Sequence, residues 1–92
     1  MNSNETVINS LGMKVRIFDL DKGLTEYEHV KVIRIISTDY NLLIMEDYLP
    51  IIGEIDGSVD IKGDDLDISF PKISAFYMNS SNVFNLMIKE DE

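Results

Sequence analysis

Ninety-two residues suffice for one domain with a single modest core, and 45% hydrophobic with 27% charged residues is typical of a soluble globular chain. The net charge of −9 argues against nucleic acids and anionic membranes as partners, because both attract cationic surfaces. The chain has no cysteine, which excludes disulfides and thiolate metal sites. No apolar run approaches the roughly 20 residues of a membrane helix, so we expect a cytoplasmic domain without direct membrane insertion.

The first residues differ in composition from the rest. Residues 1–12 are rich in Asn and Ser and end at Gly12, which predicts a flexible leader before a single β-sandwich domain over residues 13–92. A short strand through Val7 and Ile8 remains an alternative for part of this leader. The segment has an acid and no basic residue, so it does not have the pattern of a secretory signal.

The next two segments alternate like strands. Residues 13–20 begin with apolar residues at odd-numbered positions and basic residues at even-numbered ones, which predicts a half-buried strand. The two sets of alternate positions, here called parities, face opposite sides of a strand. Phe18 breaks this parity, so we expect a bend or a bulge near Ile17–Phe18, followed by a turn at residues 21–23. Residues 27–37 are long enough for a helix, but their five Val and Ile residues favour a strand. Their parity flips midway, which predicts a second bulge or a strand covered on both faces.

The most apolar part of the chain is residues 40–61, which Pro50, Gly53 and Gly57 divide into short pieces. A continuous apolar run predicts a buried strand at residues 42–45. A second strand is expected at residues 49–55, then a turn at Asp56-Gly57 and a short strand at 59–61.

The C-terminal third predicts three further strands. They lie at residues 66–70, where Pro71 ends the strand, at 73–78, and at 83–89 after a turn at 79–82. Including the less regular pieces, we expect about eight to ten short strands and no helix. The predicted fold class is all-β: a small antiparallel sandwich or flattened barrel.

Three features of the sequence invite comparison with catalytic or metal-binding motifs of other proteins. Asp19-Leu20-Asp21 resembles the nucleophile motif of haloacid-dehalogenase phosphatases, whose chemistry needs a parallel sheet with crossover helices. Residues 56–67 approach the spacing of a calcium loop, but Ile61 replaces the required glycine and Asp67 the closing glutamate. His29, the only histidine, has no cysteine or second histidine with which to bind zinc. We therefore predict no enzymatic activity, no metal and no cofactor.

The strand order resembles the N-terminal β-sandwich domain of the epsilon subunit of F-type ATP synthases, called delta in mitochondria. Pro50-Ile51-Ile52 stands where that family has Pro-Leu-Leu, Ile55-Asp56-Gly57 matches the following turn, and residues 84–91 resemble the closing strand. Glu46-Asp47-Tyr48 replaces the family's Pro-Gly-His. The family's C-terminal helical hairpin has no counterpart in this sequence.

The resemblance implies a non-catalytic subunit or module that binds a central-stalk partner similar to the gamma subunit. Such a module is cytoplasmic or, through its complex, at the membrane periphery. The family's contact loop corresponds to Glu46, Asp47, Tyr48, Leu49 and Pro50. The net charge and the apolar residues on both parities favour an alternative function for the chain. In this alternative, the chain is a stand-alone acidic protein-interaction domain, inhibitory or self-associating as a homo-oligomer, and unrelated to ATP synthesis.

Overall fold

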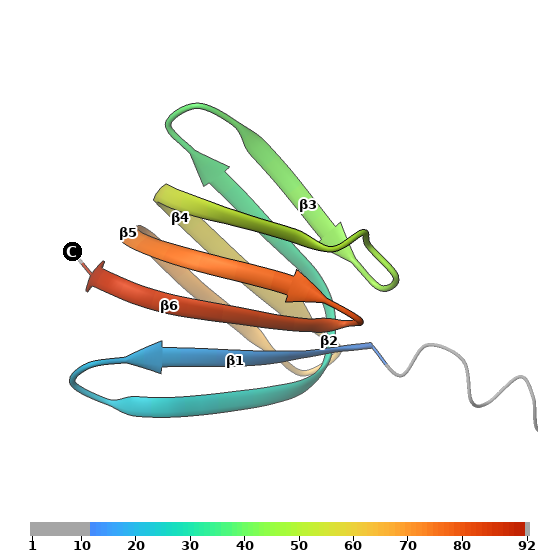
Figure 1. The fold of residues 1–92 in the computed structure, drawn as a ribbon. Helices are drawn as coiled ribbons and strands as arrows, with labels where there is room; N and C mark the ends of the chain where they lie inside the picture. Colours follow the sequence, from blue (N-terminus) through green and yellow to red (C-terminus); the bar gives the residue numbers. More distant parts are fainter. Residues whose placement is uncertain (1–11, 92) are drawn as a thin grey trace, which may run out of the picture.

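The computed structural model describes residues 12–91, which contain six strands and no helix (Figure 1). The strands are β1 (Met13–Asp19), β2 (Gly23–Ser37), β3 (Asn41–Met45), β4 (Ile51–Gly63), β5 (Asp67–Ser80) and β6 (Val83–Asp91). Residues 1–11 of the predicted leader (residues 1–12), including the alternative strand through Val7 and Ile8, lie outside the described residues.

The strands close into a barrel. Antiparallel pairs join β1 to β2, β2 to β4, β4 to β5 and β5 to β6, and β6 pairs with β1 in parallel. A closed meander of five strands must have one parallel pair, because its first and last strands run in the same direction. β3 adds to β2 outside this five-stranded barrel. The predicted all-β class is confirmed.

The strand count is lower than predicted because two expected turns are bends within longer strands. β4 runs through Gly57, where the register with β5 shifts between Gly57 and Val59. A Cβ on Gly57 would lie 2.0 Å from the carbonyl oxygen of Ile36, so glycine allows β2 and β4 to approach here. Pro71 lies in the irregular part of β5 opposite this bend and does not end the strand. Glycine and proline therefore bend these strands without interrupting the sheet.

Only one of the two predicted bulges exists. β1 keeps an unshifted register with β6 from Lys14 to Asp19, and Phe18 simply faces outward, so the bulge predicted near Ile17–Phe18 is wrong. The bulge predicted within β2 is confirmed: the register of β2 against β4 shifts between Val30 and Val32, and the buried parity changes from Val30 to Ile33. A further irregularity lies at His29, which has a φ of 61°, where the register of β2 against β1 shifts between Tyr27 and Val30.

The barrel interior contains the core. The Tyr77 and Phe84 rings stack with their centroids 5.6 Å apart, and a Cβ on Gly53 would lie 2.4 Å from the Tyr77 hydroxyl oxygen. Burial raises the pKa of the Tyr77 hydroxyl, and its hydrogen bond with Tyr40 raises the pKa further. The buried hydrophobic residues are Met13, Val15, Ile17, Val30, Ile33, Ile35, Ile44, Ile55, Val59, Ile61, Ile73, Ala75, Tyr77, Phe84, Leu86 and Ile88.

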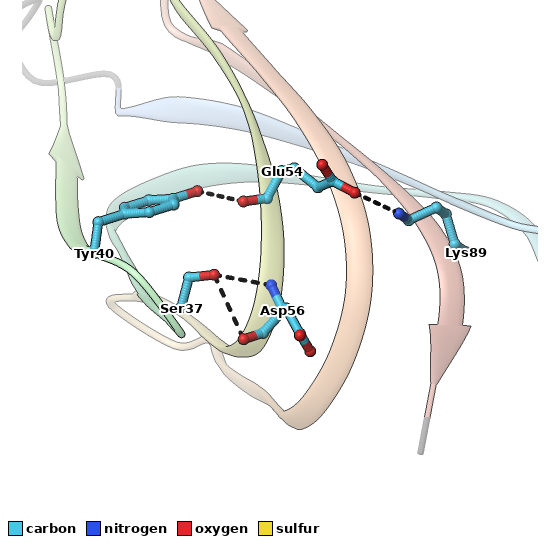
Figure 2. A network of polar contacts seen from close by, with 5 residues as sticks. All are labelled: Ser37, Tyr40, Glu54, Asp56 and Lys89. Atoms are coloured by element: carbon cyan, nitrogen blue, oxygen red, sulfur yellow. Dashed lines mark hydrogen bonds and ion pairs between the residues drawn. The ribbon is translucent and has the colours of Figure 1, made fainter.

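Side chains from the turn between β2 and β3 cover the edge of the first half of β4 (Figure 2). The Tyr40 hydroxyl donates to the Glu54 carbonyl oxygen at 2.6 Å. The Ser37 hydroxyl oxygen accepts the Asp56 N–H at 2.9 Å. Thr38 donates its N–H and its hydroxyl to the Asp56 carbonyl at 3.1 and 3.0 Å. On this β4 edge, the carbonyls of Glu54 and Asp56 and the N–H of Asp56 are therefore satisfied within the chain.

β3 is an edge strand, which corrects the buried strand predicted for residues 42–45. Ile44 is buried, but Leu43 and Met45 are 47% and 53% exposed on the outer face. An unbroken apolar run is typical of a strand covered on both faces. Here the strand is covered on one face only, and its outer side chains remain at the surface.

Candidate functional site

The loop between β3 and β4 contains the residues predicted to contact a partner, and its two acids bind within the chain. Glu46 Oε2 accepts the N–H of Gly12 at 3.3 Å. Asp47 has a φ of 68° and donates its N–H to Asn82 Oδ1 at 2.6 Å, while Asn82 Nδ2 donates to Asp47 Oδ1 at 3.2 Å. The Asp47 contacts connect the loop to the turn between β5 and β6, and the Glu46 contact connects it to the residue before β1.

The remaining loop residues are exposed to different degrees. Tyr48 packs partly against the core, and its N–H donates to the Met45 carbonyl at 3.1 Å, which closes the turn. Leu49 is 75% exposed, and Pro50 is also exposed. Of the five predicted contact residues, Leu49 and Pro50 are therefore the ones most available to a partner.

A row of apolar side chains crosses the outer face of the barrel. The strand registers place Phe76 beside Met87, Met87 beside Phe18, and Phe18 beside Leu24. We name these four residues the apolar row. Phe76, Met87 and Leu24 are 45%, 38% and 47% exposed, and Phe18 is half-buried. An antiparallel barrel normally presents polar side chains on this face, so four adjacent apolar residues require an explanation.

A second apolar pair extends this surface toward the loop. Ile52 on β4 lies opposite Met78 on β5, and the two are 75% and 42% exposed. Met78 is on the same face as Phe76, two residues away along β5, and Leu49 precedes Ile52 by three residues. The apolar surface thus extends from the apolar row to the first strand after the predicted contact loop.

Two cations border the apolar row, each held between an aromatic ring and a carboxylate. Lys89 Nζ lies 4.2 Å from the Phe76 ring centroid and 2.7 Å from Glu54 Oε2. Arg16 repeats the arrangement: its Cζ lies 5.4 Å from the Phe18 ring centroid, and its Nε lies 2.9 Å from a carboxylate oxygen of Glu26. The row therefore has a charged border on both sides.

This composition matches that of protein interfaces. Aromatic residues, Met and Arg are enriched in such interfaces, and an apolar centre with a polar rim is their usual arrangement. Phe18, Leu24 and Met87 also line a shallow hollow in which a partner side chain could insert. The sequence signal for this surface was present: Phe18 and Met87 are apolar on the outward parity. We interpreted Phe18 as a local irregularity, and the apolar residues on both parities as favouring a protein-interaction domain.

The motifs with catalytic counterparts have structural roles. Asp19 Oδ1 accepts the N–H groups of Asp21 and Lys22 at 2.7 and 3.3 Å, so it stabilises the turn after β1. Most of the acidic stretch at residues 56–67 belongs to β4. Within residues 12–91, no group of three or more His, Cys, Asp or Glu side chains could hold a metal ion.

No protein-family model matches the sequence, and no curated protein is significantly similar to it. In the part of the chain that the structure describes, no helix is long and apolar enough to cross a membrane. The function must therefore be inferred from the apolar row and its charged border.

Proposed function

We propose that this chain is a non-catalytic, cytoplasmic protein-interaction module that binds its partner on the apolar row. The single observation that carries the proposal is the exposure of four adjacent apolar side chains across β5, β6, β1 and β2. The core does not need these residues, because the interior of the barrel is filled by the inward parity of the same strands. Exposed apolar patches with a polar border are typical of protein-binding sites.

The first partner to test is the gamma subunit of a rotary ATP synthase, which the sequence resemblance suggests. Leu49 and Pro50 precede the Ile52–Met78 pair, so the predicted loop and the apolar row can contact one partner together. In this form of the proposal, the chain is a central-stalk module that can be located at the membrane periphery through its complex.

A second candidate is the stand-alone acidic interaction domain, whose partner is a basic protein. It is favoured by the parallel pairing of β1 and β6, which end side by side. This arrangement brings acids from both strand ends to the same end of the barrel as the hollow in the apolar row: Asp19, Asp21, Glu90 and Asp91. Charge complementarity would speed the association of a basic partner with this end.

A pull-down with the purified gamma subunit at about 10 µM separates the two candidates, since specific complexes commonly bind at or below this range. We expect the wild-type chain to bind and the double variant Phe76→Ser/Met87→Ser to lose binding. Leu43→Ser is the matched control, because Leu43 is similarly exposed but lies outside the apolar row. Thermal melting checks that all three proteins fold.

Absence of gamma binding rejects the central-stalk role and leaves the acidic interaction domain, which is tested with basic proteins captured from the same cells. A partner that binds the double variant as tightly as it binds the wild type contradicts the assignment of the apolar row as the binding site.

A further inference from the structure

The edge of β3 is open, in contrast to the covered edge of β4. Among the described residues, β3 pairs with β2 alone and lies at the end of the sheet (Figure 1). Natural sheets protect such edges with charged residues, proline or bulges. β3, with the sequence NLLIM, has no charged residue and no proline, and its register with β2 is continuous. The edge therefore presents a regular strand to solvent.

The hydrogen bonding of the adjacent turn shows which backbone groups face outward. The Ser37 N–H donates to the Tyr40 carbonyl at 2.8 Å, so these residues form a hydrogen-bonded pair. Hydrogen-bonded and non-hydrogen-bonded pairs alternate along an antiparallel ladder. The N–H and C=O groups of Asn41, Leu43 and Met45 consequently point away from β2. The Met45 carbonyl agrees with this, since it accepts a hydrogen bond from the Tyr48 N–H.

The side chains of the same residues form an apolar outer surface beside this edge. Leu43 and Met45 are 47% and 53% exposed, and Ile36 on the adjacent β2 is 43% exposed. An added strand would thus gain backbone hydrogen bonds and apolar cross-strand contacts together.

We propose that β3 pairs antiparallel with β3 of a second copy of this chain, about a two-fold axis at Leu43. In this register Leu43 lies opposite Leu43 of the second copy, and Asn41 lies opposite Met45. The pairing uses the outward backbone groups of all three residues, with the Met45 carbonyl shared between Asn41 of the second copy and the Tyr48 N–H that it already accepts. Because the three share one parity, their side chains stay on the outer face of the extended sheet.

Symmetry favours a second copy as the occupant, and the local charge at β3 opposes it little. Two chains of charge −9 repel each other, yet residues 40–45 carry no charge, and the residue opposite Leu43 on β2 is the cation Arg34. Repulsion is therefore weaker here than at the acidic strand ends. A two-fold pairing also covers the open β3 edge of both copies at once, which gives a closed dimer. The apolar row remains exposed in this dimer, so the inference is independent of the proposed function.

A single cysteine tests the register directly, because the natural chain has none. Residues in a hydrogen-bonded antiparallel pair have Cα atoms about 5.5 Å apart, which is within the range that a disulfide spans. We expect Leu43→Cys to form a covalent dimer on mild oxidation, measured on a non-reducing gel. Ile52→Cys is the control, since Ile52 is 75% exposed and lies away from β3. Equal cross-linking of both variants contradicts the proposal.

Sedimentation equilibrium tests the noncovalent dimer. We expect a dissociation constant on the order of 100 µM for this small interface. Leu43→Lys should raise the constant at least about tenfold, because it removes the central apolar contact and places two like charges opposite each other. Phe76→Ser should leave it unchanged, and circular dichroism checks that both variants fold.

Three results would overturn the inference. A wild-type chain that is monomeric at about 1 mM leaves β3 available only to a foreign strand. A dimer that Leu43→Lys does not weaken has its interface elsewhere. If only Phe76→Ser weakens the dimer, the dimer interface is the apolar row and not β3. None of these results decides whether the apolar row binds a different protein, so the two proposals fail independently.

Discussion

The two halves of β4 differ in the strands beside them and in the exposure of their side chains, although they are one strand. The half after Gly57 lies between β2 and β5 and contributes the buried residues Val59 and Ile61. The half before Gly57 pairs with β5, has its other edge covered by the turn between β2 and β3, and exposes Ile52. Both halves contribute to the core, the first through Ile55 and the second through Val59 and Ile61, but only the first also supports the interaction surface. The bend at Gly57 allows one strand to do both.

The strongest way to break this division is Gly57→Ala. The new Cβ would lie 2.0 Å from the Ile36 carbonyl oxygen, so β2 and β4 must move apart at the bend. We expect a loss of about 3–5 kcal/mol in the free energy of unfolding, measured by urea denaturation. Gly23→Ala is the control: its Cβ meets no atom within 4 Å, and its cost should be about 1 kcal/mol from the φ of 80° alone. Equal losses would show that packing at the bend is unimportant.

Truncating one isoleucine in each half compares them directly. Ile61 is fully buried, and Ile61→Ala should destabilise the protein by about 3 kcal/mol through lost burial and a cavity. Ile52 is 75% exposed, so Ile52→Ala should change stability by less than about 0.5 kcal/mol. The same denaturation assay measures both. A large loss for Ile52→Ala would mean that the Ile52 side chain, like that of Ile55, contributes to the core.

Gly53→Ala tests how closely the first half of β4 packs on the barrel interior. The added Cβ would lie 2.4 Å from the Tyr77 hydroxyl oxygen, which forces the ring away from its present position. We expect a loss of about 1–3 kcal/mol, because a ring stacked on Phe84 has little freedom to shift. A second effect should be weaker near-ultraviolet circular dichroism from the tyrosines. An unchanged spectrum would contradict the close contact.

The smallest expected effect is the decrease in the free energy of unfolding that Tyr77 causes at alkaline pH. Burial and the hydrogen bond with Tyr40 raise the pKa of Tyr77 above its unfolded value of 10.0. The unfolded chain therefore loses this proton first. The stabilisation is complete below about pH 10 and declines as pH rises further, by at most about 1.4 kcal/mol per pH unit. Tyr77→Phe should show a shallower decline between about pH 10 and 11.5 in urea denaturation; an identical slope would contradict this.

Sequence patterns predicted the class of fold but not the apolar row. The alternation of Val15 and Ile17 with the basic residues Lys14 and Arg16 is local, so it identifies inward residues without any knowledge of the partner strand. Phe18 on the outward parity could equally mark a bulge or an exposed residue. The choice depends on its contact with Met87, which is distant in sequence. For the predicted loop, the sequence identified the exposed Leu49 and Pro50 but not that Asp47 binds Asn82.

The sequence by itself determined that this protein is all-β and, where apolar and polar residues alternate, which residues lie inside it, because side-chain alternation has a period of two residues and needs no long-range information. The unbroken apolar run at residues 42–45 gave no such information, and Leu43 and Met45 are exposed. The tertiary structure decided that Gly57 bends β4, since a glycine permits a turn and a bend equally until the Ile36 carbonyl approaches it. It also decided that β1 and β6 close the barrel in parallel, and that closure brings the apolar row together. These features depend on register between distant segments, which local propensity does not encode.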